Sequence, residues 1–329
     1  MVPVAWGVLS RSAHYKRRVH PGISRSSAID LRAIASRSVE SAAAAARELG
    51  IPVAHGSYEA LLADRAIEAV YIPLPNHLHA TWVKLAADAG KHILCEKPFA
   101  MNAAEADDAI RHAQSRGVRV MEAFMYPFHP QWQRVRELVR IGEIGQLHAV
   151  HVHFSYTQKD PANIRNVLAA GGGGLPDIGC YAVSCARFLL GREPRRAISL
   201  IQRDPTFGTD VLSSGMLDFG VARATFTVGT QLQPTQRVDI VGTAGEITVH
   251  LPFNAWTDVP AEVTVTNSVG RRVVRSAITD QYVAMFEAFS RAIRDDGDVP
   301  IPPQDAIDNM KVLDALFRSE ASGSWETVG

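Results

Sequence analysis

Two short stretches of the sequence combine residue types that can move a proton. In "HILCEKPFA" (residues 92–100), an apolar run ends in Glu96 and Lys97, and in "GGGGLPDIGCYAV" (171–183), four glycines precede Asp177 and Tyr181. A tyrosine with an ordinary pKa near 10 is a poor proton carrier at neutral pH. A lysine ammonium nearby stabilises the phenolate, which makes such a pair suitable for general acid–base catalysis. Glycines let the backbone pass close to a ligand, and a spacing of four places Asp177 and Tyr181 on one helix face.

The first stretch lies in a region that alternates short apolar runs with helical patterns. Runs at 4–9, 31–36, 67–74, 91–96 and 118–124 predict strands, and the segments between them predict helices. Ser38 and Gly50 bound one such helix as N-cap and C-terminal glycine, and Asn102 with Glu105 predicts the start of another. Parallel neighbouring strands need helical crossovers, so residues 1–124 predict a doubly wound Rossmann domain of the α/β class.

Beyond about residue 145 the apolar residues recur with period two. Stretches such as "QLHAVHVHFSY", "ARATFTV" and "RVDIVG" predict a large, mostly antiparallel open sheet, with helices expected at 177–190, 279–295 and 303–320. Residues 125–329 therefore predict an α+β domain for substrate binding and oligomerisation. Its period-two strands predict an apolar outer face and hence a homodimer or homotetramer.

The turn after the first strand is where a doubly wound sheet would hold a dinucleotide pyrophosphate. The usual glycines are absent there, because their positions fall on Ser10, Ser12 and Tyr15, with Arg11 between the two serines. The second strand ends in Ser36 and Arg37 rather than in an acidic residue. A hydroxyl and a guanidinium suit the 2′-phosphate of NADP(H), so NADP(H) is the expected cofactor, with NAD(H) as an alternative. The basic run Arg11, Lys16, Arg17 and Arg18 has a solvated helix face as its default interpretation, although one of these residues could help to hold phosphate.

Composition limits the other classes of function. Among 329 residues, 34 Lys+Arg balance 34 Asp+Glu, so no overall basic field favours nucleic acid or an acidic membrane. No apolar run approaches the ~20 residues that a spanning helix needs, and the N-terminus shows no secretion signal. Three cysteines without metal-ligand spacing fit a reducing, cytoplasmic location, and we expect no metal site.

Four motifs in order resemble the glucose-fructose oxidoreductase, inositol dehydrogenase and rhizopine-catabolism (Gfo/Idh/MocA) family. They are "AVYIPLPNHLHA", "GKHILCEKPFA", "MEAFMYPFHPQ" and "GGGGLPDIGCYAV", and the likeness runs nearly end to end. Within the family the chain is most similar to the dihydrodiol dehydrogenase and NADP-dependent D-xylose dehydrogenase group. The resemblance implies an NAD(P)-dependent enzyme that transfers a hydride between nicotinamide and a hydroxyl or carbonyl carbon of a sugar-like substrate.

The resemblance also implies roles for individual residues. Lys97 would reach both the nicotinamide ribose and the substrate, Tyr181 would act as the acid–base group and Asp177 would orient the substrate. Asn163 and Arg165 would approach the sugar. The residues implied to border the nicotinamide are Leu74, Pro75, Asn76, His79 and Glu96.

Departures from the family pattern keep alternatives open. Tyr15 stands where a small residue is usual, His14 is polar at a usually apolar position, and Pro127 replaces a common arginine, so cofactor binding could be weakened. One alternative is an NADPH-dependent keto-sugar reductase, and another is a non-catalytic dinucleotide-binding regulator. The presence of Lys97, Asp177 and Tyr181 argues against the regulator, because a sensor does not need the proton-transfer set.

Overall fold

The computed structural model describes residues 2–329 and divides the chain into two compact units. One unit comprises the described residues up to Phe124 together with Tyr282–Ile307. The other comprises Met125–Gln281 and Asp308–Gly329. The chain thus leaves the first unit after residue 124, where the sequence predicts the domain boundary, and a later segment returns to that unit.

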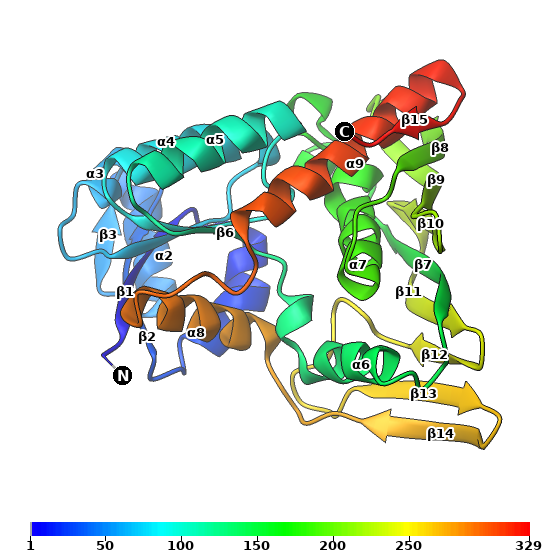
Figure 1. Cartoon of the computed structure of the whole chain (residues 1–329). Coiled ribbons are helices and arrows are strands. Elements are labelled where there is room, and N and C mark those ends of the chain that lie inside the picture. Colours follow the sequence, from blue (N-terminus) through cyan, green and yellow to red (C-terminus); the bar gives the residue numbers. More distant parts are fainter. Residues whose placement is uncertain (1) are drawn as a thin grey trace. The chain divides into compact units, whose positions relative to one another are not determined.

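The first unit is built on a parallel sheet, as the alternating strand and helix patterns predict. In the described chain its six strands have the order β3-β2-β1-β4-β5-β6, which is doubly wound around β1 (Figure 1). The strands are β1 (Val4–Leu9), β2 (Ile29–Ala35), β3 (Val53–His55), β4 (Ala69–Ile72), β5 (His92–Cys95) and β6 (Val120–Glu122). The helical segments are η1 (Tyr15–Val19), α1 (His20–Ile23), α2 (Val39–Leu49), α3 (Tyr58–Leu62), η2 (Asn76–Leu78), α4 (His79–Asp88), α5 (Ala103–Ser115) and α8 (Gln281–Arg294).

Local capping explains where two of these helices begin and end. The Ser38 side chain accepts a hydrogen bond from the Ser41 N–H, and Gly50 ends α2 with φ of 65°. The Asn102 side chain likewise accepts from the Glu105 N–H, and the Glu105 carboxylate accepts from the Met101 N–H. The predicted caps of α2 and α5 are therefore confirmed.

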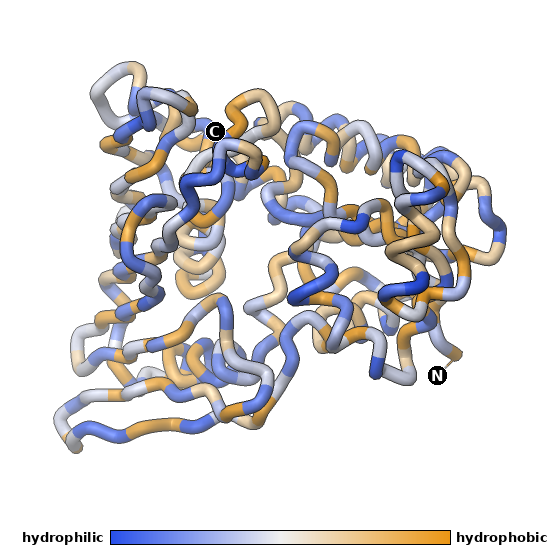
Figure 2. Tube along the Cα trace, turned by 180° about the vertical axis from the view of Figure 1, so that it is seen from behind, coloured by the Kyte–Doolittle hydropathy of each residue, from blue (hydrophilic) through white to orange (hydrophobic). Residues whose placement is uncertain are grey.

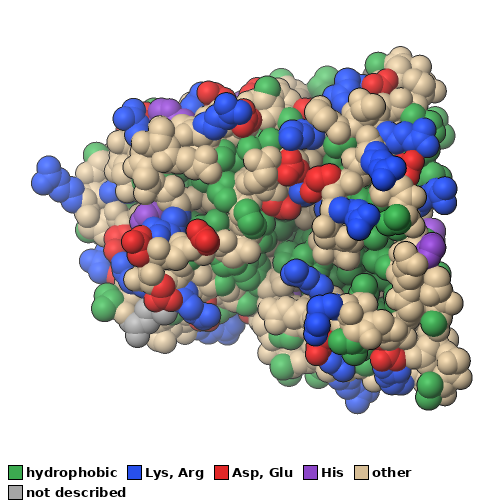
Figure 3. Space-filling model, in the orientation of Figure 1, with side chains coloured by type: hydrophobic (Ala, Val, Ile, Leu, Met, Phe, Trp, Pro, Cys, Tyr) green, Lys and Arg blue, Asp and Glu red, His purple; other side chains and the backbone are tan. Residues whose placement is uncertain are grey.

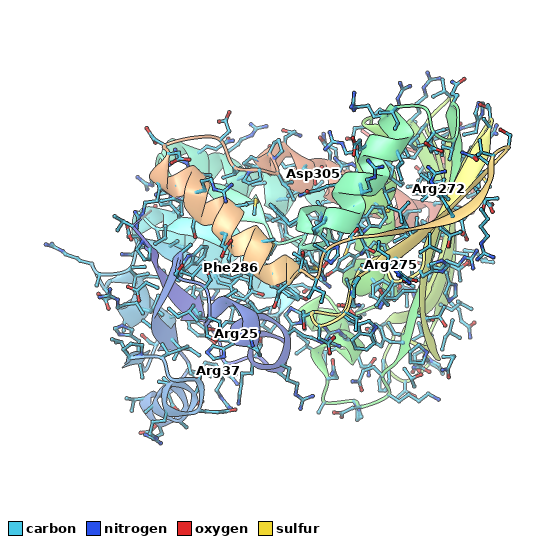
Figure 4. All side chains as sticks on the ribbon, turned by 90° about the horizontal axis from the view of Figure 1, so that it is seen from below. Arg25, Arg37, Arg272, Arg275, Phe286 and Asp305 are labelled. Carbon is cyan, nitrogen blue, oxygen red and sulfur yellow. The ribbon has the colours of Figure 1, made fainter. Side chains whose placement is uncertain are left out.

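The core of this unit joins its first strand to its last helix. Every residue of β1 is buried, and the Trp6 ring lies 4.7 Å from that of Phe286 in α8, measured between centroids. Figure 4 labels Phe286 on this helix. The Trp6 indole N–H also donates to Ser290 Oγ at 3.2 Å. Burial of these aromatic rings explains why a helix from the C-terminal part of the sequence completes the N-terminal unit.

The second unit is built on a mixed sheet whose only described parallel neighbours are β7 and β10. Across the described residues its nine strands have the order β14-β13-β12-β11-β7-β10-β9-β8-β15. They are β7 (Leu147–Thr157), β8 (Arg196–Arg203), β9 (Asp210–Asp218), β10 (Arg223–Gly229), β11 (Gln231–Gly242), β12 (Gly245–Val249), β13 (Glu262–Asn267), β14 (Gly270–Arg275) and β15 (Glu326–Thr327). The helical segments are η3 (Tyr126–Phe128), α6 (Pro130–Arg140), η4 (Ile164–Asn166), η5 (Leu168–Ala170), η6 (Leu175–Gly179), α7 (Cys180–Leu190) and α9 (Pro303–Ser322).

The strands of this sheet alternate as predicted, but their less buried face is mixed rather than apolar. Val150, Val152 and Phe154 of β7 are buried, whereas His151 between them is exposed and its ring contacts Thr225 Oγ1 at 2.6 Å. Figure 2 shows the same alternation along the β13–β14 hairpin. Figure 3 shows Lys and Arg side chains over this hairpin, where Arg272 pairs with Glu143 and Arg275 with Glu262. The outer face thus carries polar and charged residues beside apolar ones such as Ile198 and Leu200, and assembly through it stays a prediction.

No helix in residues 2–329 combines the length and apolar character that crossing a membrane requires.

Candidate active site

The first group of predicted site residues lines one cavity in the first unit. This cavity of ≈ 600 Å³ lies beside the turn after β1 and the end of β2. Its lining includes the five residues predicted there and five more; the full set is Ser10, Arg11, Ser12, Ala13, Lys16, Arg17, Ser36, Arg37, Glu48 and Tyr58. Figure 4 labels Arg37, whose side chain is exposed. Four cations around one opening make this cavity suitable for phosphate groups.

Hydrogen bonds inside the cavity fix its small polar residues. Ser12 Oγ accepts from the Tyr15 N–H at 3.1 Å, so this serine caps the helical segment that follows. Ser36 Oγ donates to Ser41 Oγ at 3.0 Å. Lys16 Nζ lies 2.5 Å from Glu48 Oε2, which neutralises one of the four cations. Arg11, Arg17 and Arg37 thus supply the cationic surface that remains.

The bulky Tyr15 is accommodated without closing this cavity. The first helical segment contains the π-helix η1 from Tyr15 onward, and the Tyr15 side chain is fully buried and does not line the cavity. Its ring lies 5.9 Å from that of Tyr71, measured between centroids, and burial raises the pKa of its hydroxyl. The wider π-helical turn makes room for a side chain where an α-helix would favour a small residue.

Glu96 is held inside the first unit by three groups. Its carboxylate accepts hydrogen bonds from the Tyr71 hydroxyl and from the Lys97 backbone N–H, and its Oε1 lies 3.6 Å from His14 Nε2. Burial acts to raise the pKa of Glu96, but the contact with His14 and the positive charge of Lys97 outweigh it and lower the pKa to about 2. An ionised Glu96 therefore fixes the backbone from which the half-buried Lys97 side chain extends.

His79 ties together two loops that were predicted to border the nicotinamide. Its ring nitrogens lie 2.8 Å from the carbonyl oxygens of Leu74 and Pro98, and its side chain is fully buried. Burial lowers the pKa of His79, and the two backbone carbonyls oppose this effect. The imidazole thus connects the loop of Leu74, Pro75 and Asn76 to the loop of Lys97.

The second group of predicted residues lies in the second unit, where Asp177 is the centre of a polar network. Arg165 Nε donates to Asp177 Oδ2 at 2.8 Å, and the Tyr156 hydroxyl donates to the same oxygen at 2.6 Å. The negative charge of Asp177 raises the pKa of Arg165, while burial and then Asp177 raise the pKa of Tyr156. Arg165 therefore stays charged and Tyr156 stays protonated, so both continue to donate.

Tyr181 and Asp177 lie on successive parts of one helical segment. Asp177 belongs to the π-helix η6, and Tyr181 lies in the first turn of α7. The Tyr181 ring is buried against Phe253, with centroids 5.1 Å apart, and its hydroxyl donates to Met125 Sδ at 3.4 Å. Asn163 caps η4 by accepting from the Arg165 N–H at 3.1 Å. Within this unit the structure therefore joins Asn163, Arg165 and Asp177.

Several residues near these groups were not identified from the sequence. Glu48 and Tyr58 come to the cavity from helices whose sequence gives no ligand signal. Tyr156 stands at the end of the period-two run "QLHAVHVHFSY", where side chains point alternately to the two faces of the sheet. Tyr156 continues the parity of the buried Val150, Val152 and Phe154, so a polar tip at the end of that apolar row was the available signal.

A doubly wound unit with a basic cavity, followed by a sheet unit carrying a tyrosine, an aspartate and an arginine, defines a class of dinucleotide-dependent oxidoreductases. Two family models match the chain. "Oxidoreductase family, NAD-binding Rossmann fold" matches residues 11–124, and "GFO/IDH/MocA C-terminal domain" matches residues 132–248. The chain belongs to the Gfo/Idh/MocA oxidoreductase family.

The chain is also similar to individual oxidoreductases. A D-xylose 1-dehydrogenase (NADP(+)) from Haloferax volcanii is 39% identical and covers 97% of this chain and 98% of its own length. A trans-1,2-dihydrobenzene-1,2-diol dehydrogenase from Bos taurus is 33% identical over 65% of this chain and 64% of its own length. A solved 3-ketoreductase from Actinomadura kijaniata, in complex with NADP and TDP-benzene, superposes with a TM-score of 0.91 at 27% identity, covering 96% of this chain and 98% of that chain.

Proposed function

We propose that this protein is an NADP(H)-dependent oxidoreductase that transfers a hydride between nicotinamide and a hydroxyl or carbonyl carbon of a sugar or sugar-like diol. The observation that carries the proposal is the cavity that gathers Arg37, at the end of β2, with Arg11 and Arg17. A 2′-phosphate adds two negative charges to the adenosine end of the cofactor, and guanidinium groups bind phosphate with paired hydrogen bonds. The end of β2 carries Ser36 and Arg37 rather than an acidic residue, and Glu48 in the cavity lining is paired with Lys16.

The residues present fit the dinucleotide. Ser10, Arg11 and Ser12 would hold the pyrophosphate, and Ser36 and Arg37 would hold the 2′-phosphate. Leu74, Pro75 and Asn76 would border the nicotinamide, with His79 and Glu96 holding their loops in place. When bound, the nicotinamide supplies the redox step by accepting or donating a hydride at C4.

The proton route belongs to the protein's own side chains. Tyr181 would take the proton of the reacting hydroxyl, or return it in the reductive direction, and the Lys97 ammonium would stabilise the phenolate and contact the substrate. Asp177, held by Arg165 and Tyr156, would accept a hydrogen bond from a second substrate hydroxyl. Asn163 and Arg165 would contact further hydroxyls, because a polyhydroxylated ligand needs a placed polar partner for each one.

The direction of the reaction has two candidates. The relative from Haloferax volcanii is named as a sugar dehydrogenase, whereas the solved structure from Actinomadura kijaniata is named as a 3-ketoreductase. Sugar oxidation by NADP⁺ is our first choice, with D-xylose or a related aldose as substrate. Reduction of a keto-sugar by NADPH is the second, favoured by that structural likeness. The third candidate is a non-catalytic regulator, and turnover of any substrate by the purified protein would exclude it.

A rate assay at 340 nm separates these alternatives. Purified protein would be offered NADP⁺ with pentoses, hexoses and dihydrodiols, and NADPH with keto-sugars. Turnover that depends on one of these classes, and that is faster with NADP(H) than with NAD(H), would support the proposal. Tight cofactor binding without turnover in either direction would favour the regulator.

Assembly and location complete the proposal. We expect a homodimer or homotetramer through the sheet of the second unit, where Leu200 of β8 is 80% exposed and Ile198 lies on the same face of the strand. Sedimentation of the wild type and of Leu200→Asp would test this, since a monomeric wild type would contradict it. The cytoplasm is the expected location, because all three cysteines are buried thiols.

A further inference from the structure

The glycine run of the second unit passes through a narrow space between two groups. A Cβ on Gly172 would lie 2.5 Å from the carbonyl oxygen of Arg165. A Cβ on Gly173 would lie 2.0 Å from Asp210 Oδ1, and Gly173 has φ of +135°. The close approach of the Asp210 carboxylate therefore requires glycine at position 173.

Asp210 is buried and uses its side chain to hold this run. Its Oδ2 accepts from the Leu175 N–H at 2.6 Å and from Ser213 Oγ at 2.9 Å, and the residue is 2% exposed. Burial raises the pKa of Asp210, and the hydrogen bonds from Leu175 and Ser213 oppose this effect. A carboxylate that accepts from the first N–H groups of a helical segment caps that segment and fixes its direction.

The capped segment carries two proposed active-site side chains. Leu175 is the first residue of η6, which holds Asp177 and leads directly into α7 with Tyr181. On the other side of the run, the Arg165 carbonyl packs against Gly172 while its guanidinium pairs with Asp177. The glycine run thus links both members of the Arg165–Asp177 pair to Asp210.

We propose that Asp210 is a positioning residue for the reaction, which anchors the glycine run and the start of η6 so that Asp177 and Tyr181 keep their orientation. This inference rests on the proposed function. Asp210 contacts neither cofactor nor substrate in this account and acts through the backbone of Gly173 and Leu175.

Kinetics of Asp210 variants provide the first test. We expect Asp210→Ala to lower kcat by at least about tenfold, because small displacements of catalytic groups are costly. Asp210→Asn should lose less, because its amide oxygen still accepts from the Leu175 N–H. The affinity for NADPH, measured by nicotinamide fluorescence, should stay within about twofold, because the cofactor residues lie in the other unit.

The matched control is Asp218→Asn, at the opposite end of the same strand. Asp218 also accepts a backbone hydrogen bond, from the Gly220 N–H, and pairs with Arg196. A kcat for Asp210→Ala close to that of Asp218→Asn would overturn the proposal, and so would an equal loss of NADPH affinity. If Asp210→Ala does not fold, Asp210→Asn and the following variant decide.

Gly174→Ala provides a second test that depends on the carboxylate itself. Gly174 has φ of −71°, which suits alanine, but its added Cβ would lie 3.1 Å from Asp210 Oδ2. The substitution should therefore lower kcat by about tenfold in the wild type. The loss should be less than about threefold in the Asp210→Asn background, where the uncharged amide forms weaker hydrogen bonds and can shift from the added Cβ. Equal losses of kcat in both backgrounds would contradict the proposed anchoring by Asp210.

Hydrogen exchange separates this inference from the proposed function. Amides of residues 173–175 and 177–181 should exchange slowly in the wild type and at least about tenfold faster in Asp210→Ala, with exchange elsewhere in the second unit unchanged. Unchanged exchange in this segment would overturn the inference. If no sugar or keto-sugar is turned over by the wild type, the proposed function fails, and exchange still decides whether Asp210 anchors the segment.

Discussion

Arg165 Nε lies 2.8 Å from Asp177 Oδ2, and the Tyr156 hydroxyl donates to the same carboxylate oxygen. Two donors on one oxygen restrain the position of this carboxylate. A restrained carboxylate suits an acceptor that orients a substrate hydroxyl. Asp177 alone was predicted as the orienter, and the structure adds Arg165 and Tyr156 as the groups that hold it.

Tyr156→Phe tests the contribution of this second donor. Loss of a hydrogen bond to a charged group should lower kcat/KM by about tenfold, with NADPH affinity unchanged. Initial rates and a nicotinamide fluorescence titration would measure the two quantities. The neighbouring Thr157→Val is the control, because it removes a hydroxyl that donates to the Leu232 carbonyl instead. Similar rates for both variants would remove Tyr156 from the network.

Tyr181→Phe tests the proposed acid–base group. The variant should keep its cofactor affinity and lower turnover by about two to four orders of magnitude, which is the usual contribution of general acid–base catalysis. The ring packing against Phe253 stays intact in this variant, so thermal unfolding should change little. A turnover equal to that of the wild type would exclude Tyr181 from proton transfer.

His129 predicts a loss of stability in acid. Burial lowers the pKa of His129 to about 4, and its Nδ1 accepts from the Gln131 N–H at the start of α6. In the unfolded chain this histidine has an ordinary pKa near 6.5. Between pH 6.5 and pH 4 it is therefore protonated in the unfolded state and neutral in the folded state. The free energy of unfolding should therefore fall by up to roughly 3 kcal/mol between pH 7 and pH 4 through this group.

His129→Asn separates this titration from other acid effects. Asparagine is a strong N-cap and carries no titrating group, so the pH-dependent part of the loss should shrink in the variant. Urea unfolding of both proteins at pH 7.0 and pH 4.5 would give the difference, whatever the variant costs at neutral pH. An identical pH dependence in the two proteins would show that His129 does not drive the acid response.

The order of strands and helices followed from the sequence because periodicity reports burial directly. The caps Ser38, Gly50 and Asn102 were predicted, since their chemistry is local. The short strand β3 and helix α3 were missed, because three and five residues carry too little pattern. The return of α8 to the first unit depends on the packing of Trp6 against Phe286. These residues are 280 positions apart in the sequence, so their contact leaves no local signal.

Residues of the candidate site were predicted where they belong to sequence motifs. They were missed where only the three-dimensional packing brings them together. Arg37 and the serines of the first turn were identified from their positions at strand ends. The accommodation of Tyr15 was not foreseen, because the sequence does not reveal that residues 15–19 form a π-helix. Asp210 gave no signal either, because a single aspartate at the start of a strand becomes informative only when Gly173 and Leu175 lie against it.

Titration of NADPH and NADH by nicotinamide fluorescence, on the wild type and on Arg37→Ala, tests the central claim most directly. The wild type should bind NADPH more tightly than NADH, and Arg37→Ala should remove most of that difference. Arg25→Ala is the control, because Arg25 is an exposed arginine of the same unit that does not line the cavity (Figure 4). Equal affinities of the wild type for the two cofactors, or no binding of either, would contradict an NADP(H)-dependent enzyme.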